Sequence, residues 1–264
     1  MKMKLTFLGT GTSVGVPQIG CHCRVCKSCD ARDKRLRCSA LLQCEGTNIL
    51  IDCSPDFREQ MLRINFEEPL HAVLITHEHY DHVGGIDDLR PYSYLRNLPL
   101  YADEYAITHL RQRLPYCLVI NRYPGVPQLT AEVVEPHKTF RVGPLDIVPL
   151  RVIHGKLPIL GYRIGPLGYI TDMTTMPDED FALLQGIKIL VVNALRHEPH
   201  PTHQTVEQAI AFSRRLGDNL PTYLIHMSHH LGLHAEEEAL LPRGIHFAYD
   251  GLVLEIEHES RNAK

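Results

Sequence analysis

The chain has 264 residues, of which 44% are hydrophobic and 22% charged, and its formal net charge is −4. This length and balance are typical of a globular protein with a sizeable core, and we expect a single domain over residues 1–264. The negative charge argues against a general basic surface for nucleic acid, because such binding needs many Lys and Arg contacts with phosphates. We therefore expect no stable nucleic-acid partner.

The sequence also bears on the cellular compartment. The first apolar stretch breaks at Gly9, too soon for a signal-peptide core, and no run approaches the ~20 apolar residues of a membrane helix. We expect a cytoplasmic protein with no membrane partner. Five of the eight cysteines lie between Cys21 and Cys38, and in such a protein this clustering favours metal binding or free thiols over disulfides.

The amino-terminal part of the chain is predicted to form strands and one helix. Apolar runs at 4–8, 40–42 and 48–51 predict strands, with a glycine-rich turn after the first. No helical pattern follows that turn at once, so it is not a dinucleotide-binding fingerprint. Ser54 and Pro55 predict the start of a helix, with Ser54 as its cap and Pro55 in its first position.

Later elements alternate between strands and helices. Residues 103–114 and 205–216 have helical spacing, and Thr205 and Gln208 are placed to form a capping box. Four apolar runs, at 72–75, 168–171, 187–193 and 222–225, predict buried strands that end in polar residues. Sheets with helices on their faces usually build their sites at the carboxyl ends of strands, so these polar residues are the candidates for a functional site.

The densest group of polar residues follows the strand at 72–75. His77, His79, Asp81 and His82 place three imidazoles and a carboxylate within six residues. One strand-to-loop junction cannot bury that polarity without a partner, and a divalent cation is the natural one. Imidazole suits Zn²⁺, Mn²⁺ and Fe²⁺, and the carboxylate adds negative charge. The alternative is a solvated polar loop.

This spacing resembles the H-x-H-x-D-H signature of the metallo-β-lactamase superfamily. The later ligands that the family would require appear in order along the chain as His154, Asp172 and His226. The resemblance implies an α/β protein with a four-layer αββα sandwich and two active-site metal ions. It assigns the first ion to His77, His79 and His154. It assigns the second to Asp81, His82 and His226, with Asp172 bridging the two ions and Asp81 also counted as catalytic.

A second cluster consists of Cys21, Cys23 and Cys26, and Cys29 would extend it. Three or four thiolates at this spacing suit a structural zinc; free thiols or a redox pair are the alternative. A thiol cluster after the opening glycine-rich turn resembles the cyclic phosphodiesterases (PhnP type) of the carbon–phosphorus lyase pathway. That resemblance implies a zinc-binding insertion around 21–38 whose fourth ligand is His229, with Cys29 as the competing ligand.

Three further residues are candidates for contact with substrate. His203, just before a predicted helix, matches the position of the proton donor in the family that the chain resembles. His200 lies in the same histidine-rich loop, and Lys156 follows the predicted ligand His154. Either side chain would suit a phosphate oxygen, but ordinary exposed residues are the alternative for both.

These features together predict a metal-dependent phosphodiesterase acting on a small cyclic phosphate or phosphodiester. Two divalent ions, Zn or Mn or else Fe, would generate hydroxide from water and clamp the reacting oxygens, and one structural Zn would hold the thiol cluster. The resemblance also suggests a homodimer. The alternatives are a tRNA 3′-processing endonuclease, a lactonase or thioesterase of the same fold, and a zinc-binding interaction module without turnover.

Overall fold

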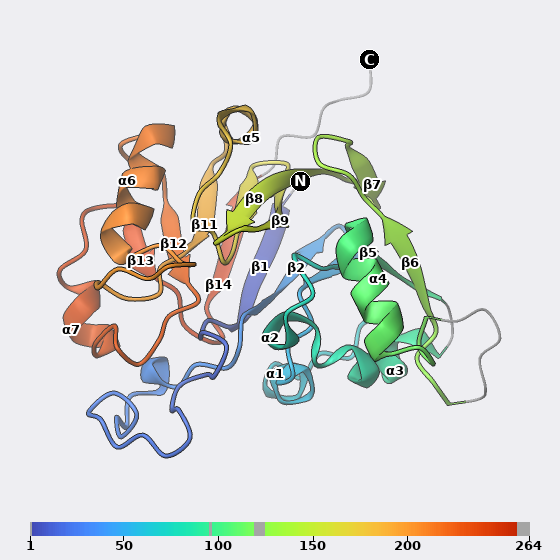
Figure 1. Cartoon of the computed structure of the whole chain (residues 1–264), viewed down its shortest axis with the longest axis horizontal. Helices are drawn as coiled ribbons and strands as arrows, with labels where there is room; N and C mark the ends of the chain where they lie inside the picture. The colour runs from blue at the N-terminus through green and yellow to red at the C-terminus, as the bar shows by residue number, and fades with distance from the viewer. Residues whose placement is uncertain (1, 95–96, 119–124, 258–264) are drawn as a thin grey trace.

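The computed structural model describes residues 2–94, 97–118 and 125–257. In this part of the chain two seven-stranded sheets pack face to face, with helices outside them (Figure 1). The first sheet has the order β14-β1-β2-β3-β4-β5-β6. Its strands are β1 (Lys2–Gly9), β2 (Ser39–Cys44), β3 (Thr47–Ile51), β4 (Ala72–Leu74), β5 (Leu98–Ala102), β6 (Leu129–Val133) and β14 (Val253–Glu257).

The second sheet has the order β13-β12-β11-β10-β9-β8-β7. Its strands are β7 (Phe140–Val142), β8 (Leu145–His154), β9 (Leu157–Ile164), β10 (Leu167–Ile170), β11 (Ile189–Asn193), β12 (Thr222–Ile225) and β13 (Ile245–Phe247). The helices are α1 (Phe57–Arg63), α2 (Tyr80–Val83), α3 (Arg90–Ser93), α4 (Glu104–Arg113), α5 (Asp178–Leu183), α6 (Val206–Leu216) and α7 (His234–Glu238). Short 3₁₀ turns occur at Ala31–Asp33 and Ile86–Leu89.

Three apolar clusters hold these layers together. The inner cluster lies between the sheets and includes Leu5 from the first and Tyr162 from the second. One outer cluster joins the first sheet to α1 and α4, and the other joins the second sheet to α6. On β3, Leu50 faces an outer cluster while Ile49 faces the inner one, as expected of a strand covered on both faces. The predicted four-layer αββα sandwich is confirmed.

The directions of the strands determine where the predicted site residues lie. β3, β4 and β5 run parallel to one another, as do β10, β11 and β12. Their carboxyl ends therefore lie at one edge of each sheet. The polar residues that follow β4, β10 and β12 come from these edges, where parallel strands usually form functional sites.

The predicted start of the first helix is wrong. The helix begins at Phe57, and Asp56 occupies its cap position. The Ser54 hydroxyl accepts a hydrogen bond from the Asp56 N–H (3.2 Å), and the Ser54 carbonyl accepts one from the Phe57 N–H (2.9 Å), so a turn containing Pro55 precedes the helix. The strands predicted at 4–8, 40–42 and 48–51 are confirmed as parts of β1, β2 and β3. No helix in the described ranges is long and apolar enough to cross a membrane.

The amino terminus of α6 offers a test of the local packing. The Thr205 hydroxyl accepts from the Gln208 N–H (3.2 Å), and the Gln208 side chain accepts from the Thr205 N–H (2.9 Å), which is the predicted capping box. Thr205→Ala should lower the free energy of unfolding by about 1 kcal/mol, because the Gln208 N–H in the first turn of α6 loses its hydrogen-bond acceptor. Denaturant unfolding at a fixed metal concentration measures this, and Thr205→Ser should retain most of the stability. Equal stability of all three proteins would contradict the assignment.

Candidate metal centre

The structure brings together every residue that the sequence predicts as an active-site ligand. Within each of two groups, the candidate ligand atoms all lie within 4.8 Å of one another. The first group is His77, His79 and His154; the second is Asp81, His82, Asp172 and His226. All of these residues are buried except His79, which is partly buried. Each sheet supplies part of the set, so the groups form only where the two sheets meet.

Asp172 lies between the two groups. Its Oδ2 is 3.9 Å from Nε2 of His77 in the first group and 3.3 Å from Nε2 of His226 in the second. Its Oδ1 is 3.4 Å from Nε2 of His82. One carboxylate therefore contacts imidazoles of both groups, which is the arrangement expected of a bridging ligand.

Hydrogen bonds hold the outward-facing ring nitrogens of three of the candidate ligands. Nδ1 of His82 donates to Oδ2 of Asp52 (2.8 Å). Nδ1 of His77 donates to the Thr76 hydroxyl (3.0 Å), which in turn donates to Asp52 (2.9 Å). Nδ1 of His154 donates to the carbonyl of Thr202 (2.9 Å). Such bonds fix the tautomer and leave Nε2 of each ring with its lone pair facing the cluster, as in metal sites generally.

Asp52 is a site residue that the sequence analysis missed. It follows β3, and β3 is parallel to β4, so its carboxylate lies beside the end of the strand that carries His77. The sequence does contain the pattern that could have found it, an acidic residue directly after a buried apolar strand. Asp52 has a positive φ of 58°, a left-handed conformation that is rare outside glycine and common at functional sites.

The buried polar atoms fit divalent metal ions. Nε2 of His77 and Nε2 of His82 are buried and have no hydrogen-bond partner. Burial opposes a charge on His82, but the surrounding carboxylates outweigh it and raise the pKa of His82 well above its ordinary value. Burial lowers the pKa of His77 well below its ordinary value. Imidazole lone pairs facing paired carboxylates form a donor set for Zn²⁺, Mn²⁺ or Fe²⁺, and a cation would satisfy both the lone pairs and the negative charge.

Two of the candidate ligands lie at strand ends in strained conformations. Asp172 and His226 have φ values of 55° and 59°, and such conformations typically need about 1–3 kcal/mol of support from their surroundings. The Thr171 hydroxyl donates to Asp172 Oδ1 (2.6 Å), and the following Met173 N–H donates to the Asn193 side chain (2.7 Å). These bonds turn the Asp172 carboxylate from the end of β10 into the cluster.

The three candidate substrate residues differ in position. His203 is 8% exposed, and its Nδ1, which has no hydrogen-bond partner, lies 3.9 Å from Asp172 Oδ2. The His200 ring lies 5.1 Å from the His203 ring, whereas Lys156 is exposed in the turn between β8 and β9. Burial is the main cause that lowers the pKa of His203 to about 3. Its imidazole is therefore neutral at neutral pH, and an anionic substrate beside it would favour protonation.

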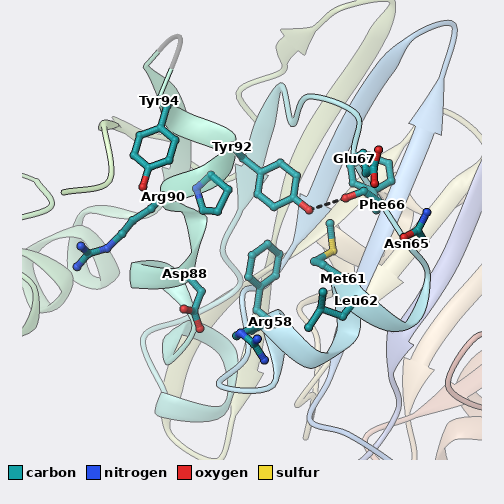
Figure 2. Close-up of a pocket in the computed structure, with 12 residues that line it drawn as sticks. Arg58, Met61, Leu62, Asn65, Phe66, Glu67, Asp88, Arg90, Tyr92 and Tyr94 are labelled. Atoms are coloured by element: carbon teal, nitrogen blue, oxygen red, sulfur yellow. Dashed lines mark hydrogen bonds between the residues drawn. The ribbon is translucent and has the colours of Figure 1, made fainter. Parts of the chain in front are cut away.

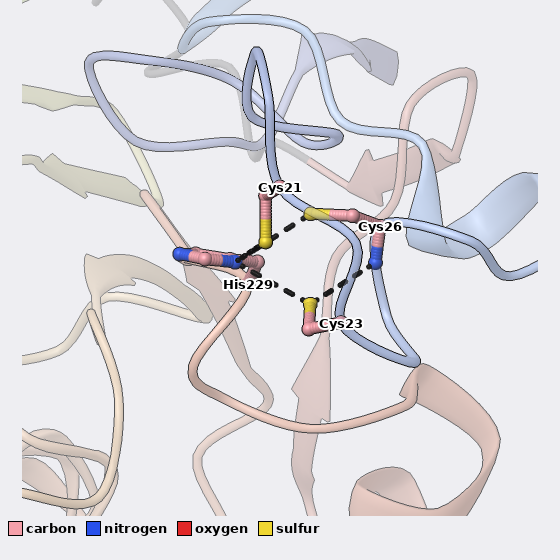
Figure 3. A group of neighbouring side chains, drawn as sticks. All are labelled: Cys21, Cys23, Cys26 and His229. Atoms are coloured by element: carbon pink, nitrogen blue, oxygen red, sulfur yellow. Dashed lines mark hydrogen bonds between the residues drawn. The ribbon is translucent and has the colours of Figure 1, made fainter.

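The thiol cluster gains its fourth member from the far end of the chain (Figure 3). Nδ1 of His229 lies 3.2 Å from Cys21 Sγ and 3.5 Å from the sulfurs of Cys23 and Cys26. Cys29 is exposed and does not belong to this group. The Cys26 backbone N–H is the main cause that lowers the pKa of Cys23 to about 6, which favours the thiolate that binds zinc. Three thiols and one imidazole suit a closed tetrahedral zinc site.

A cavity of about 440 Å³ lies elsewhere, in the outer helical layer (Figure 2). Side chains of α1 and α3 line it, including Met61 and Tyr92, and the Tyr92 hydroxyl donates to the Phe66 carbonyl (2.8 Å). None of the predicted ligands or substrate residues lines it. The chemistry of the site therefore belongs to the strand ends and not to this cavity.

Known proteins resemble the chain over most of its length. Residues 47–227 match the beta-lactamase superfamily domain. An octanoyltransferase from Porphyromonas gingivalis is 47% identical over 264 residues, which cover 99% of this chain and 53% of that protein. The chain thus spans about half the length of that relative.

Two solved structures extend the comparison. A diphosphatase from the PhnP family has 41% identity and a TM-score of 0.91, and the match covers 98% of each chain. Zn²⁺-bound PqqB from Methylobacterium extorquens shares the fold, with a TM-score of 0.75 and 22% identity over 95% of this chain and 99% of that one. With a superfamily match over most of its length and a PhnP relative over nearly all of it, the chain belongs to the beta-lactamase superfamily and, within it, to the PhnP family of metallo-β-lactamase-fold hydrolases.

Proposed function

We propose that the chain is a metal-dependent phosphodiesterase that hydrolyses a small cyclic phosphate or phosphodiester. The observation that carries the proposal is the position of Asp172, which contacts His77 of one ligand group and His82 and His226 of the other. Two divalent ions held by these groups would activate water and neutralise charge on the oxygens of an in-line phosphoryl displacement. We propose Zn²⁺, Mn²⁺ or Fe²⁺ for these two ions and a structural Zn²⁺ for the thiol cluster.

The side chains of the site have distinct tasks in this proposal. Asp172 and Asp81 supply negative charge that balances the cations, and the bonds of Asp52 keep two imidazoles in the orientation needed for binding. His203 holds a proton at Nδ1 and transfers it to the leaving oxygen. Because the pKa of the buried ring is about 3, it would be protonated only when a substrate anion beside it favours the charged form, and the attacking water would supply the proton.

A second candidate is hydrolysis of a diphosphate linkage. The relative at 41% identity is named a diphosphatase, and it is similar over 98% of both chains. The phosphorus centre and the demand for charge neutralisation are shared by both reactions. They differ in the group expelled, because a phosphate leaves more readily than an alkoxide and needs less protonation.

Acyl substrates are a third class of compound that a screen must include. The octanoyltransferase that resembles this chain is about twice as long, so its name also describes a part that this chain does not match. A screen should therefore compare cyclic phosphates, alkyl and p-nitrophenyl phosphodiesters, diphosphate diesters, lactones and octanoyl thioesters, each with added Zn²⁺ or Mn²⁺. The proposal expects the highest kcat/KM on a phosphodiester. A preference for lactones or thioesters would overturn it.

Asp172 tests the ligand assignment. Asp172→Ala should remove metal from the active site and lower hydrolysis by at least about 100-fold, since loss of even an outer-shell partner of a metal ligand reaches that size. Elemental analysis should still find the thiol-site zinc. The matched control is Asp178→Ala, whose side chain is 97% exposed, and it should keep both metal and activity. An active Asp172→Ala protein with full metal content would refute the bridging role.

His203 tests the proton transfer. A positioned acid typically contributes about 10²–10⁴-fold, and the benefit grows with the basicity of the leaving group. His203→Ala should therefore slow an alkyl or cyclic phosphodiester far more than a p-nitrophenyl diester, with both active-site ions retained. Equal losses on both substrates would indicate phosphate binding instead, and loss of metal would identify His203 as a ligand, since it lies within ligand distance of His154 and Asp172.

A further inference from the structure

A short segment of the chain connects the two metal-binding clusters. His226 reaches the active site, where its Nε2 lies 3.3 Å from Asp172 Oδ2 and 3.5 Å from Asp81 Oδ2. His229, three residues later, places its Nδ1 3.2 Å from Cys21 Sγ. Figure 3 shows the His229 ring directed at the three sulfurs from its own loop. Only Met227 and Ser228 separate the two histidines, so a displacement of one is transmitted to the other.

Met227 leaves little room for the segment to adjust. Its side chain is fully buried, its N–H donates to the Thr10 carbonyl (3.0 Å), and its carbonyl accepts from the Thr12 N–H (3.0 Å). The loop that holds Met227 also carries the thiol insertion. Gly11 N–H donates to the Leu36 carbonyl (2.8 Å), and Val16 and Arg35 exchange backbone bonds of 2.8 and 2.7 Å. Both ends of the insertion are thus tied to the stretch that pairs with Met227.

Ser228 connects the same segment to the rest of the site. Its N–H donates to the Leu195 carbonyl (3.0 Å), and the Leu195 N–H donates to the Gln204 carbonyl (3.0 Å). The Gln204 N–H then donates to the Met173 carbonyl (3.1 Å). Gln204 is adjacent to His203, and Met173 is adjacent to Asp172. A shift of Ser228 therefore reaches the proton donor and the bridging ligand through backbone hydrogen bonds.

The thiol cluster is the direct contact between the insertion and His229. The apolar cluster of the insertion consists of Val16, Val25 and Cys26, with Cys21, Cys23 and Leu233 packed against it, and so small a cluster contributes little burial. Other bonds join the insertion to residues further on, where the His234 N–H donates to Asp33 (2.7 Å) and Arg24 pairs with Glu236 (2.7 Å). His226 itself has a φ of 59°, a conformation that persists only where neighbouring contacts impose it. The contacts on its carboxyl-terminal side lead directly to the thiol cluster.

We propose that the Cys21, Cys23, Cys26 and His229 cluster positions His226, so that filling the thiol cluster raises the metal affinity of the group containing Asp81, His82, Asp172 and His226. The other group should respond less, because His77, His79 and His154 come from the ends of β4 and β8 and only Asp172 is shared between the two groups. The inference rests on the ligands of the proposed function but not on its substrate. It assigns the thiol cluster a role in setting the affinity of the active site in addition to local stability.

The test measures metal binding without turnover. Zn²⁺ is titrated in chelator-buffered solution, and elemental analysis counts bound ions at each free concentration. His229→Ala should lose the thiol-site ion and weaken one active-site ion by about 10–100-fold, the usual effect of losing a supporting contact to a metal ligand. His229→Cys, which restores four ligands, should recover both. The weakening should persist in a His79→Ala background, which impairs the other ligand group. It should disappear in a His82→Ala background, which impairs the group that contains His226.

A second variant separates positioning from general instability. Met61 is 5% exposed in the outer layer, apart from both metal clusters, and Met61→Ala should lower the melting temperature without changing active-site affinity. If Met61→Ala weakens the active-site ion as much as His229→Ala does, the positioning role is wrong. It is also wrong if His229→Ala empties the thiol site and leaves both active-site affinities unchanged.

If His229→Ala does not fold, chemical modification of the thiols in a chain that keeps His229 tests the same inference. In a Cys29→Ser background, which removes the exposed thiol outside the cluster, an organomercurial should release the thiol-site ion. The inference expects one active-site ion to dissociate at lower chelator concentration afterwards. Release of the thiol-site ion alone, with unchanged retention of the others, overturns it. Absence of phosphodiesterase activity would affect none of these measurements and would bear only on the proposed function.

Discussion

The site depends on one buried carboxylate. Asp52 is fully buried, and burial raises its pKa, whereas its contacts with His82 and Thr76 act in the opposite direction. Removing one partner of such a buried pair typically destabilises a protein by about 3–5 kcal/mol. The same bonds that make the buried charge tolerable also orient His82 directly and His77 through the Thr76 hydroxyl. The hydrogen bonds that stabilise the buried carboxylate in the folded chain are therefore the same bonds that orient the candidate ligands.

Strand geometry decides which parts of the site could be predicted. The H-x-H-x-D-H spacing and the apolar runs before Asp172 and His226 predicted candidate ligands that the structure brings together, because a parallel strand carries its last residues to the sheet edge whatever the loops do. The strands β5 to β9, β13 and β14 were not predicted. Of these, β5, β8 and β9 contain Pro99, Pro149 and Pro158, and proline inside an apolar run argues against a strand when neighbouring strands are unknown. The other four are short strands of three to five residues without proline, too short to show a clear alternation.

The parts of the site that could not be predicted depend on contacts between residues far apart in the sequence. Local spacing left Cys29 and His229 as competing fourth members of the thiol cluster, because Cys29 continues the thiol pattern and His229 lies about 200 residues away. The structure brings in His229 because Met227 pairs with Thr10 and Thr12. The position of Asp52 after an apolar strand could have marked it as a candidate, but its contact with His82 depends on β3 lying parallel to β4, and the sequence of β3 alone does not specify that pairing. The Ser54 cap was wrong because Ser54 supports a turn before the helix.

The environment of His203 links this architecture to the choice of substrate. The ring is buried among other imidazoles and its pKa is lowered, so any proton that it transfers in the proposed reaction would have to come from the attacking water or the substrate. A phosphate leaving group needs little protonation, whereas an alkoxide leaving group must be protonated as it departs. The fold and the ligands are common to both reactions. Under the proposed function, the distinction between a phosphodiesterase and a diphosphatase would therefore rest on how strongly a bound anion favours protonation of His203, and not on the metal ligands.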